Sequence, residues 1–290
     1  MIFEKNKYNI YIIMDNDFED DLTILPVKPR PEDKPIKFHP TLPDINKGAC
    51  MIDIAKPRSG KTLRCVNYLQ NPNFFQGKFD AVYIYSSTMS NGDDTARFLY
   101  DEFSDTIYSD YSDAHLQSII NYQDSIPKAQ RPKIALIFDD FIAFPNINKN
   151  SLMFKIATSY RHHNIGLLLY NTQMLKYVPP VVRASVNYVI LSQNSNQKQV
   201  EALAEEYGGT YGIEKFKDIF AQATSQPFGF LYLDLYGFTG EGNKPKAYAN
   251  FNRLLYEAPV SYTKKMLGNS EYQNTEEDSR RENKLQNDDI

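Results

Sequence analysis

Apolar runs and amphipathic segments alternate along the chain from Gly48 to about residue 192. Short apolar runs bounded by turn residues are typical of strands, whereas apolar positions spaced three and four apart predict helices. The predicted strands span 50–55, 80–87, 133–139, 165–171 and 186–192, and the predicted helices span 61–70, 93–103, 113–124 and 149–162. Such alternation builds a mainly parallel sheet with helices on both faces, so we predict an α/β fold.

The pattern changes after the last of these strands. Two helical periodicities, 197–207 and 213–224, follow each other, and two segments of alternating apolar and polar residues come next, at 228–236 and 246–251. The residues between these last two segments are rich in glycine, which favours a turn. We therefore expect a C-terminal β-hairpin that closes one side of the sheet.

Both ends of the chain differ in composition from the part between them. Residues 1–47 contain an acidic run and many prolines, which suit an extended arm with a short strand at 8–14. This arm is either a solvated leader or a segment that wraps a neighbouring subunit. Residues 259–290 are polar and charged, so we expect a disordered tail or a peptide that docks on a shell protein. The folded domain is then 48–258.

Length and cysteine content narrow the class of protein. A chain of 290 residues holds one sizeable α/β core. It has no run of about 20 apolar residues, which a membrane-spanning helix requires, and its charged first residues are unlike a secretory signal. Cys50 and Cys65 lie in a predicted strand and a predicted helix, and we interpret them as core residues. We therefore expect a reducing, cytosol-like compartment.

The net charge of −4 comes from the C-terminal tail. Beyond Gly268 the tail holds seven Asp and Glu residues against three Lys and Arg residues, and 3 minus 7 is the whole −4. The rest of the chain is therefore roughly neutral. A neutral body can still carry a local basic stripe, so the net charge neither supports nor excludes a nucleic-acid partner.

A phosphate-binding loop lies between the first predicted strand and the first predicted helix. The strand Met51–Ile54 runs into a loop that ends Gly60-Lys61-Thr62. Backbone N–H groups and the helix dipole converge at such a loop, where Lys61 would reach the β- and γ-phosphates of ATP and Thr62 would bind Mg²⁺. The predicted nucleotide-binding residues are Ala55, Lys56, Pro57, Arg58, Ser59, Gly60, Lys61, Thr62 and Asp139. Ala55 stands where the pattern normally has its first glycine.

A second chemical feature is an apolar strand that ends in two carboxylates, Asp139 and Asp140. Taken alone, such a pair is also common as a helix cap. Beside a phosphate loop, Asp139 would hold Mg²⁺ through a water molecule, and Asp140 would polarise the attacking water as a general base. A carboxylate pair is typical of NTPases of the additional-strand class, so it favours hydrolysis over phosphoryl transfer to an alcohol.

The third feature is a predicted helix with a basic end, Arg161-His162-His163, followed by an apolar strand that ends Thr172-Gln173. Together with the phosphate loop, the Asp139-Asp140 strand, the segment 179–190, and the strand 228–234 with residues 249–251 after it, this set resembles the FtsK/HerA superfamily of P-loop motor ATPases. It is most similar to the genome-packaging ATPases of large DNA viruses, virophages and tailless-phage relatives. The resemblance covers residues 49–252 and implies a RecA/FtsK-like P-loop NTPase fold.

The resemblance also implies roles for single residues. Gln173 matches the polar sensor that reads the γ-phosphate or orients the water. Arg161 and Arg183 are both candidates for an arginine finger that acts on the neighbouring subunit, and the sequence does not choose between them. His162 and His163 are interpreted as cations favoured by a helix C-terminus. Asp140 replaces the glutamate that many family members carry.

In this interpretation the chain forms a homo-oligomeric ring, a pentamer or hexamer, that packages double-stranded DNA with capsid or portal-vertex partners in host cytoplasm or a viral factory. Lys149, Lys176, Tyr177 and the turn around Lys244 are candidate DNA contacts or simply solvated surface residues. Two alternatives stay open. One is another FtsK/HerA assembly or export ATPase, such as the zonula-occludens-toxin-like proteins, which usually add a membrane-spanning helix. The other is a nucleotide-binding assembly protein without motor activity.

Overall fold

The computed structural model describes residues 36–89, 95–145, 147–238 and 244–259. The chain divides into two units, 1–34 and 35–290, and all described residues belong to the second. The expected short strand at 8–14 and the tail from residue 260 onward lie outside the described residues. Among the described helices, none has the length and apolar character needed to cross a membrane.

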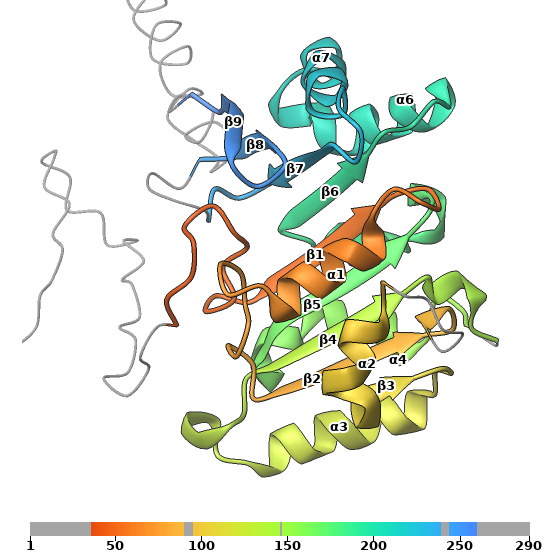
Figure 1. Cartoon of the computed structure of the whole chain (residues 1–290), viewed down its shortest axis with the longest axis vertical. Helices are drawn as coiled ribbons and strands as arrows, with labels where there is room; N and C mark the ends of the chain where they lie inside the picture. Colours follow the sequence, from red (N-terminus) through yellow and green to blue (C-terminus); the bar gives the residue numbers. More distant parts are fainter. Residues whose placement is uncertain (1–35, 90–94, 146, 239–243, 260–290) are drawn as a thin grey trace, which may run out of the picture. The chain divides into compact units, whose positions relative to one another are not determined.

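The described strands form one mixed sheet in the order β3-β2-β4-β5-β1-β6-β7-β8-β9 (Figure 1). The six strands from β3 to β6 in this order are parallel, and β7, β8 and β9 are antiparallel. The strands are β1 Ala49–Ile54, β2 Ala81–Ser86, β3 Ile107–Tyr108, β4 Ile134–Asp139, β5 Ile165–Thr172, β6 Tyr188–Ser192, β7 Phe230–Asp234, β8 Lys246–Ala249 and β9 Arg253–Glu257. The predicted mainly parallel sheet with a C-terminal hairpin is confirmed.

The position of β5 defines the type of sheet. β5 pairs in parallel with β1 on one side and with β4 on the other, so one strand separates the phosphate-loop strand from the strand that ends in Asp139. This is the inserted strand that the additional-strand class of P-loop NTPases requires. The fold is therefore that of a P-loop NTPase, as the sequence predicted.

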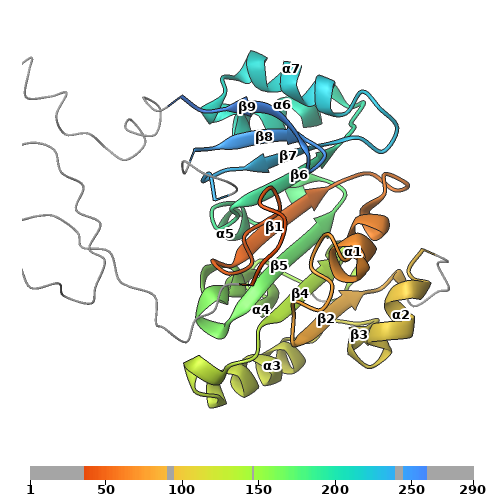
Figure 2. The same ribbon diagram turned by 60° about the vertical axis from the view of Figure 1, so that its left-hand side comes forward.

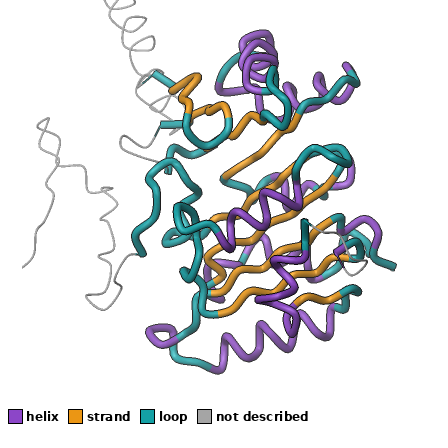
Figure 3. Tube along the Cα trace, in the orientation of Figure 1, coloured by secondary structure: helices purple, strands orange, loops and turns teal. Residues whose placement is uncertain are grey.

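Helices cover both faces of the sheet (Figure 3). Each face has its own apolar core. Residues of α1 and α2 pack on one face, and residues of α3, α4, α6 and α7 pack on the other. Figure 2 shows α6 and α7 alongside β7, β8 and β9. The helices are α1 Lys61–Gln70, α2 Arg97–Phe103, α3 Asp113–Ser125, α4 Leu152–Lys155, α5 Pro180–Arg183, α6 Gln197–Tyr207 and α7 Ile213–Ala223.

The expected helix at 149–162 is wrong. Only α4 is α-helical there, and the chain continues in 3₁₀ turns at Ile156–Thr158 and Tyr160–His163. Ser159, between these turns, has a φ of −127°, which is outside the helical region. The hydroxyl of Tyr160 donates a hydrogen bond to the carbonyl of Gly48, which fixes this side chain on the sheet. Tertiary contacts therefore override the apolar spacing of the segment.

Three short elements were not expected from the pattern: β3, α5 and β9. β3 has only two residues, and α5 is a single turn that begins at Pro180, where proline is favoured. The expected turn at 237–243 lies partly outside the described residues.

The N-terminal segment before β1 packs on the domain. Leu42 and Ile45, which belong to the expected arm, are buried in the same core as α1. The Nζ of Lys133 donates to the carbonyl of Ile45 at 3.1 Å, and Ile36 and Asn46 exchange two hydrogen bonds of 2.9 Å. The described part of the arm, from residue 36, therefore contributes to the core under α1.

Candidate nucleotide-binding site

The phosphate loop joins the carboxyl end of β1 to the N-terminus of α1. Gly60 caps the helix with a φ of 85°, a left-handed conformation that glycine adopts without strain. Arg58 is also left-handed, with a φ of 63°, whereas Ala55 does not have a positive φ. The backbone N–H of Ala55 donates to the carbonyl of Thr172 at 3.0 Å. Alanine thus replaces the usual glycine here without backbone strain.

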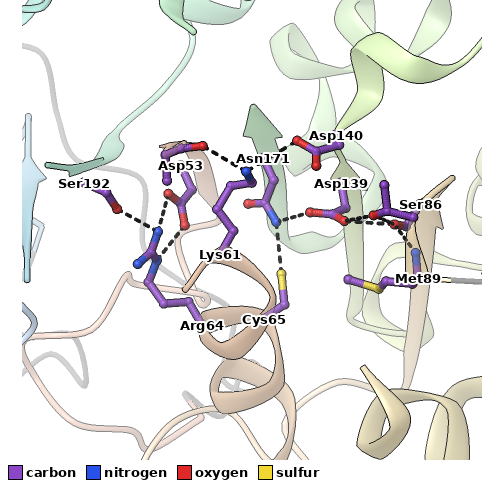
Figure 4. Close-up of polar contacts among 12 residues, drawn as sticks. Asp53, Lys61, Arg64, Cys65, Ser86, Met89, Asp139, Asp140, Asn171 and Ser192 are labelled. Atoms are coloured by element: carbon purple, nitrogen blue, oxygen red, sulfur yellow. Dashed lines mark hydrogen bonds and ion pairs between the residues drawn. The ribbon is translucent and has the colours of Figure 1, made fainter. Parts of the chain in front are cut away.

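Lys61 crosses the loop and faces the carboxylate pair (Figure 4). Its side chain is buried, with 7% of the residue exposed, and its Nζ donates to the carbonyl of Ala55 at 2.9 Å. The same Nζ lies 3.5 Å from Oδ1 of Asp140. Asp140 follows β4 directly and has a φ of 42°, an uncommon conformation for a residue with a side chain. The structure therefore brings together the predicted lysine and the predicted general base.

Asp139 occupies the centre of a polar row across the carboxyl ends of three strands (Figure 4). Ser86 of β2 pairs in register with Asp139 of β4, and Ser86 Oγ donates to Asp139 Oδ2 at 2.9 Å. From β5, Asn171 Nδ2 donates to Asp139 Oδ1 at 2.8 Å. Asp139 is only 2% exposed. Neighbouring strands thus fix both oxygens of this carboxylate.

The ionisation of Asp139 is perturbed by this environment. Burial raises the pKa of its carboxyl above the ordinary value, because the charged form loses its hydration. The hydrogen bond from Asn171 acts in the opposite direction and lowers the pKa, while the negative charge of Asp140 raises it further. A cation bound beside this carboxylate would offset both the loss of hydration and the repulsion from Asp140, as expected for a buried acid that binds a metal ion.

A buried ion pair beneath the loop was missed in the sequence. Arg64 of α1 donates from Nε and Nη2 to the two oxygens of Asp53, at 2.7 and 2.8 Å. It also donates to the carbonyl of Ser59 in the loop at 3.0 Å and to Ser192 Oγ of β6 at 3.0 Å. One guanidinium thus ties the loop to two strands. The signal was present in the sequence, since Asp53 is a charge inside an otherwise apolar strand.

The guanidinium of Arg64 stays charged in the folded protein. Burial alone would lower the pKa of Arg64, but the adjacent Asp53 carboxylate outweighs it and raises the pKa above the ordinary value. A bidentate geometry of this kind is the strong form of an arginine–carboxylate contact. Removing one partner would leave an uncompensated buried charge, so the pair keeps the loop in one place.

The residues present fit a magnesium-bound nucleotide. Asp139 and the half-buried Thr62 would supply the hard oxygen ligands that Mg²⁺ prefers. Beside them, Asn171 Oδ1 and Thr172 Oγ1 are buried and make no hydrogen bond within the described part of the chain, and the buried Asp140 Oδ1 has the 3.5 Å ion-pair contact with Lys61 Nζ but no hydrogen bond. Buried polar atoms are normally satisfied, so this cluster at the carboxyl ends of β4 and β5 is suited to a polar ligand.

The remaining predicted residues lie in two places. Gln173 is half-buried directly after β5, at the same edge as the loop. Arg161 and Arg183 precede β5 and β6, so in this parallel part of the sheet they lie toward the amino edge, away from the loop of their own chain. Arg183 forms an ion pair with Glu206. Arg161 is exposed, and its guanidinium carbon lies 5.5 Å from the ring centre of Tyr160.

The other basic residues named from the sequence are surface groups. His162 is exposed, and Nδ1 of His163 lies 2.8 Å from an oxygen of Asp124. Lys149 and Lys176 are exposed, and Lys244 is half-buried. No contact among the described residues gives any of these three lysines a role in the nucleotide site, and their part in DNA binding stays a prediction.

No protein-family model and no curated protein matches the chain. Among solved structures, the chain is similar to the genome packaging NTPase B204 from Sulfolobus turreted icosahedral virus 2 in complex with sulfate, at 14% identity over 69% of this chain and 96% of that chain, with a TM-score of 0.48. The complex of that protein with AMP gives 18% identity over 65% and 93%, with a TM-score of 0.47.

A second kind of similar structure is the N-terminal domain of zonular occludens toxin from Neisseria meningitidis, at 13% identity over 74% of this chain and 97% of that chain, with a TM-score of 0.33. The similar structures thus include viral genome-packaging NTPases, the group that the motifs resemble. All three TM-scores are below 0.5.

Proposed function

We propose that this chain is an ATPase that hydrolyses Mg-ATP in a homo-oligomeric ring and drives double-stranded DNA into a preformed viral capsid. The observation that carries the ATPase part is the meeting of Lys61, Asp139 and Asp140 where β1 and β4 end on either side of β5. The packaging part rests on the motif set described from the sequence, which resembles the packaging branch of the FtsK/HerA motors.

The proposed chemistry follows from the positions of these side chains. The phosphate chain of ATP would lie over residues 55–62, where backbone N–H groups and the N-terminus of α1 favour negative charge. Lys61 would exchange its contacts with Ala55 and Asp140 for the β- and γ-phosphates. Mg²⁺, held by Thr62 and Asp139, would supply positive charge to the phosphates when bound. Asp140 would then orient the attacking water and accept its proton.

Gln173 would complete the site from the end of β5. This strand lies between the loop strand and the carboxylate strand, so a polar side chain just beyond Thr172 would reach the region between them. We propose that Gln173 contacts the γ-phosphate or the water, and that its contact is lost when phosphate leaves.

We propose Arg161 as the arginine finger. A finger must be free to enter the site of the neighbouring subunit and to place its charge on the transferred phosphate. Arg183 is already paired with Glu206, whereas no ion pair of Arg161 is found among the described residues. Because the amino edge faces away from its own loop, Arg161 would act in trans, which makes activity depend on assembly of the ring.

DNA would contact the ring through exposed basic and aromatic side chains such as Lys149, Lys176 and Tyr177. Contacts of this kind are directed to phosphates and carry no sequence information, which suits a motor that moves along any genome. Assembly would take place in the host cytoplasm or a viral factory, with capsid or portal-vertex proteins as partners.

The test is ATP turnover per chain as a function of protein concentration, with and without long double-stranded DNA. We expect turnover to rise with concentration and with DNA. Lys61→Ala should lower it by about 10²–10³-fold, the usual effect of losing one charge-stabilising donor. Lys215→Ala is the control, because Lys215 is exposed on α7, which packs on the face of the sheet opposite α1, and it should keep parental turnover.

Turnover that stays near background, does not depend on concentration and ignores DNA would contradict the motor and leave a nucleotide-binding assembly protein. Clear turnover that depends on concentration but not on DNA would contradict the packaging part alone, and would favour an assembly or export ATPase.

A further inference from the structure

A cavity of about 390 Å³ opens directly beside the phosphate loop. It lies between α1 and the segments that flank β7 and β8, and Gly60 and Arg64 belong to its wall. Half of the other lining residues are aromatic or aliphatic, among them Leu63, Phe228, Phe230 and Phe251, and the other half are uncharged polar residues and one histidine. Its volume is in the range of small-molecule sites.

Two of these apolar side chains are exposed although they stand next to a polar loop. Leu63, the residue after Thr62, is 52% exposed, and Phe228 is 69% exposed. The ring of Phe228 reaches the loop itself, because its Cδ1 lies 3.7 Å from the position that a Cβ on Gly60 would take. Exposed apolar groups of this size at a functional edge are suited to a ligand that covers them.

The backbone holds Phe228 in an unusual conformation. Its φ is 60°, which is rare for a residue with a bulky side chain. Gly229 follows, and a Cβ there would lie 2.8 Å from the carbonyl oxygen of Ala223 and 2.9 Å from that of Gln226, so the turn accepts no other residue without moving. Backbone strain of this kind concentrates at ligand-binding positions. The turn thus presents the ring of Phe228 at the mouth of the cavity.

Two polar side chains of the wall on α1, Arg64 and Asn67, are engaged with other protein groups. The guanidinium of Arg64 is paired with Asp53 and lies 5.0 Å from the ring centre of Phe230. The amide of Asn67 donates to the carbonyl of Leu63 and accepts from Asn71. A flat, weakly polar ligand therefore suits the cavity better than a charged one.

We infer that this cavity holds the purine base of the nucleotide, stacked against Phe228 and packed on Leu63. The inference deepens the proposed function and rests on it. Gly60 ends the loop that would take the phosphates and also lines the cavity, so the cavity is continuous with the proposed phosphate site. A nucleotide whose phosphates lie on the loop has its base within reach of this wall. Aromatic stacking is tolerant of base identity, since every base has a π-face.

The test compares ATP with inorganic tripolyphosphate, which has the phosphates and lacks the base. Calorimetric titrations with Mg²⁺ present should show that the parent protein binds ATP more tightly than tripolyphosphate. Phe228→Ala should weaken ATP binding by about tenfold, the effect expected for loss of one stacking platform, and leave tripolyphosphate binding unchanged. Tyr122→Ala is the matched control, because Tyr122 is 60% exposed on α3, which packs on the other face of the sheet.

Parental ATP affinity in Phe228→Ala would overturn the inference, as would a change in oligomeric state alone, which would mark Phe228 as a subunit contact. Equal affinity of the parent for ATP and tripolyphosphate would overturn it while leaving the phosphate site intact. Binding of neither compound would overturn the proposed function as well.

Photolabelling gives a second, independent measurement. 8-Azido-ATP carries its reactive group on the purine, so irradiation of the full chain should label the peptide that contains Phe228 or the one that contains Leu63, and excess ATP should prevent it. Labelling confined to other peptides would overturn the inference.

Discussion

The two edges of the parallel part of the sheet carry their charges in different ways. At the carboxyl edge, charged groups are buried and hydrogen-bonded within one chain. Asp139 accepts hydrogen bonds from Ser86 and Asn171, and Asp53 is paired with Arg64. At the amino edge, Arg161 is exposed and is found in no ion pair within the described residues.

This difference indicates what each edge does. A preorganised set of buried groups stabilises charge inside its own subunit without further ordering. Arg161, a long exposed cation, has no such partner among the described residues, so it gains most by entering the site of another molecule. The comparison therefore predicts that damage to the carboxyl edge acts in cis and damage to the amino edge acts in trans.

The largest expected effect comes from the amino edge. Arg161→Ala should lower turnover of the assembled protein by about 10³-fold or more, the range seen for arginine fingers, while each subunit still binds ATP. Arg183→Ala is the matched control, since Arg183 pairs with Glu206 and should retain most activity. Turnover and ATP binding are measured on the same samples.

Mixing two inactive variants tests whether Arg161 acts on the site of the neighbouring subunit. Arg161→Ala subunits retain an intact phosphate site, and Asp140→Asn subunits retain an intact arginine. Mixed rings should therefore regain part of the lost turnover. Absence of rescue, with mixed assembly shown by pull-down of a tagged variant, would contradict action in trans.

The next largest predicted loss of hydrolysis comes from the carboxyl edge. Asp140→Asn removes the proposed base but keeps the shape of the side chain, so hydrolysis should fall by about 10²–10⁴-fold. ATP binding should persist, because Lys61 loses a competing carboxylate 3.5 Å from its Nζ. Asp101→Asn, at an exposed position on α2, is the control. Single-turnover hydrolysis and ATP titration of the same variant test this prediction. Loss of ATP binding in Asp140→Asn would mean that the residue binds the nucleotide rather than activating the water.

The carboxyl edge was largely predictable from the sequence because its parts are local. The phosphate loop is a contiguous run between a strand and a helix, and Asp139-Asp140 follows its strand directly, so each was found without knowing the fold. The alternation of strands and helices placed both at the same edge, since parallel strands end together.

The supporting contacts could not be predicted in the same way. Arg64 meets Asp53 only because a face of α1 packs on β1, and Asn171 meets Asp139 only because β5 is inserted beside β4. The break in the predicted helix 149–162 has a similar origin, since Tyr160 reaches the carbonyl of Gly48, 112 positions earlier in the chain. Long-range partners of this kind leave little trace in local periodicity.

A stability prediction tests how tightly the amino edge is packed. Gly48 has a φ of 85°, and a Cβ there would lie 2.8 Å from Cγ of Arg161 and 2.9 Å from the Tyr160 ring. Gly48→Ala should therefore cost about 2–4 kcal/mol of unfolding free energy, from backbone strain and overpacking together. Gly77→Ala separates the two causes, because Gly77 has a φ of 64° but nothing within 4 Å of its Cβ position.

We expect Gly77→Ala to cost only about 1–2 kcal/mol, the backbone part alone. Denaturant unfolding of both variants gives the difference. Equal losses would contradict the close contact among Gly48, Tyr160 and Arg161, and would leave Arg161 freer than the packing indicates.

The smallest predicted effect is a gain in stability rather than a loss, and it comes from replacing Asp139. Burial raises the pKa of this carboxyl, so the folded state binds its proton more readily than the unfolded state does. The resulting stabilisation is fully present below the unfolded-state pKa of about 3.8 and is lost as pH rises through the higher folded-state pKa. Asp139→Asn removes this loss, and its amide can still accept from Asn171 while donating to the Ser86 hydroxyl.

Asp139→Asn should therefore melt at a higher temperature than the parent at pH 8 when Mg²⁺ and nucleotide are absent. Each kcal/mol regained is worth about 2–4 °C in a domain of this size. The gain in melting temperature should shrink toward pH 4, where the carboxyl of the parent is neutral as well. Asp140→Asn is the matched control, because Asp140 is the next residue in the chain and is less buried. A gain that does not change with pH would assign the effect to packing rather than to charge. If Asp139→Asn stabilises the empty protein and also loses hydrolysis, then this carboxylate is maintained for its ligand, and that property would separate the carboxyl edge from the rest of the sheet.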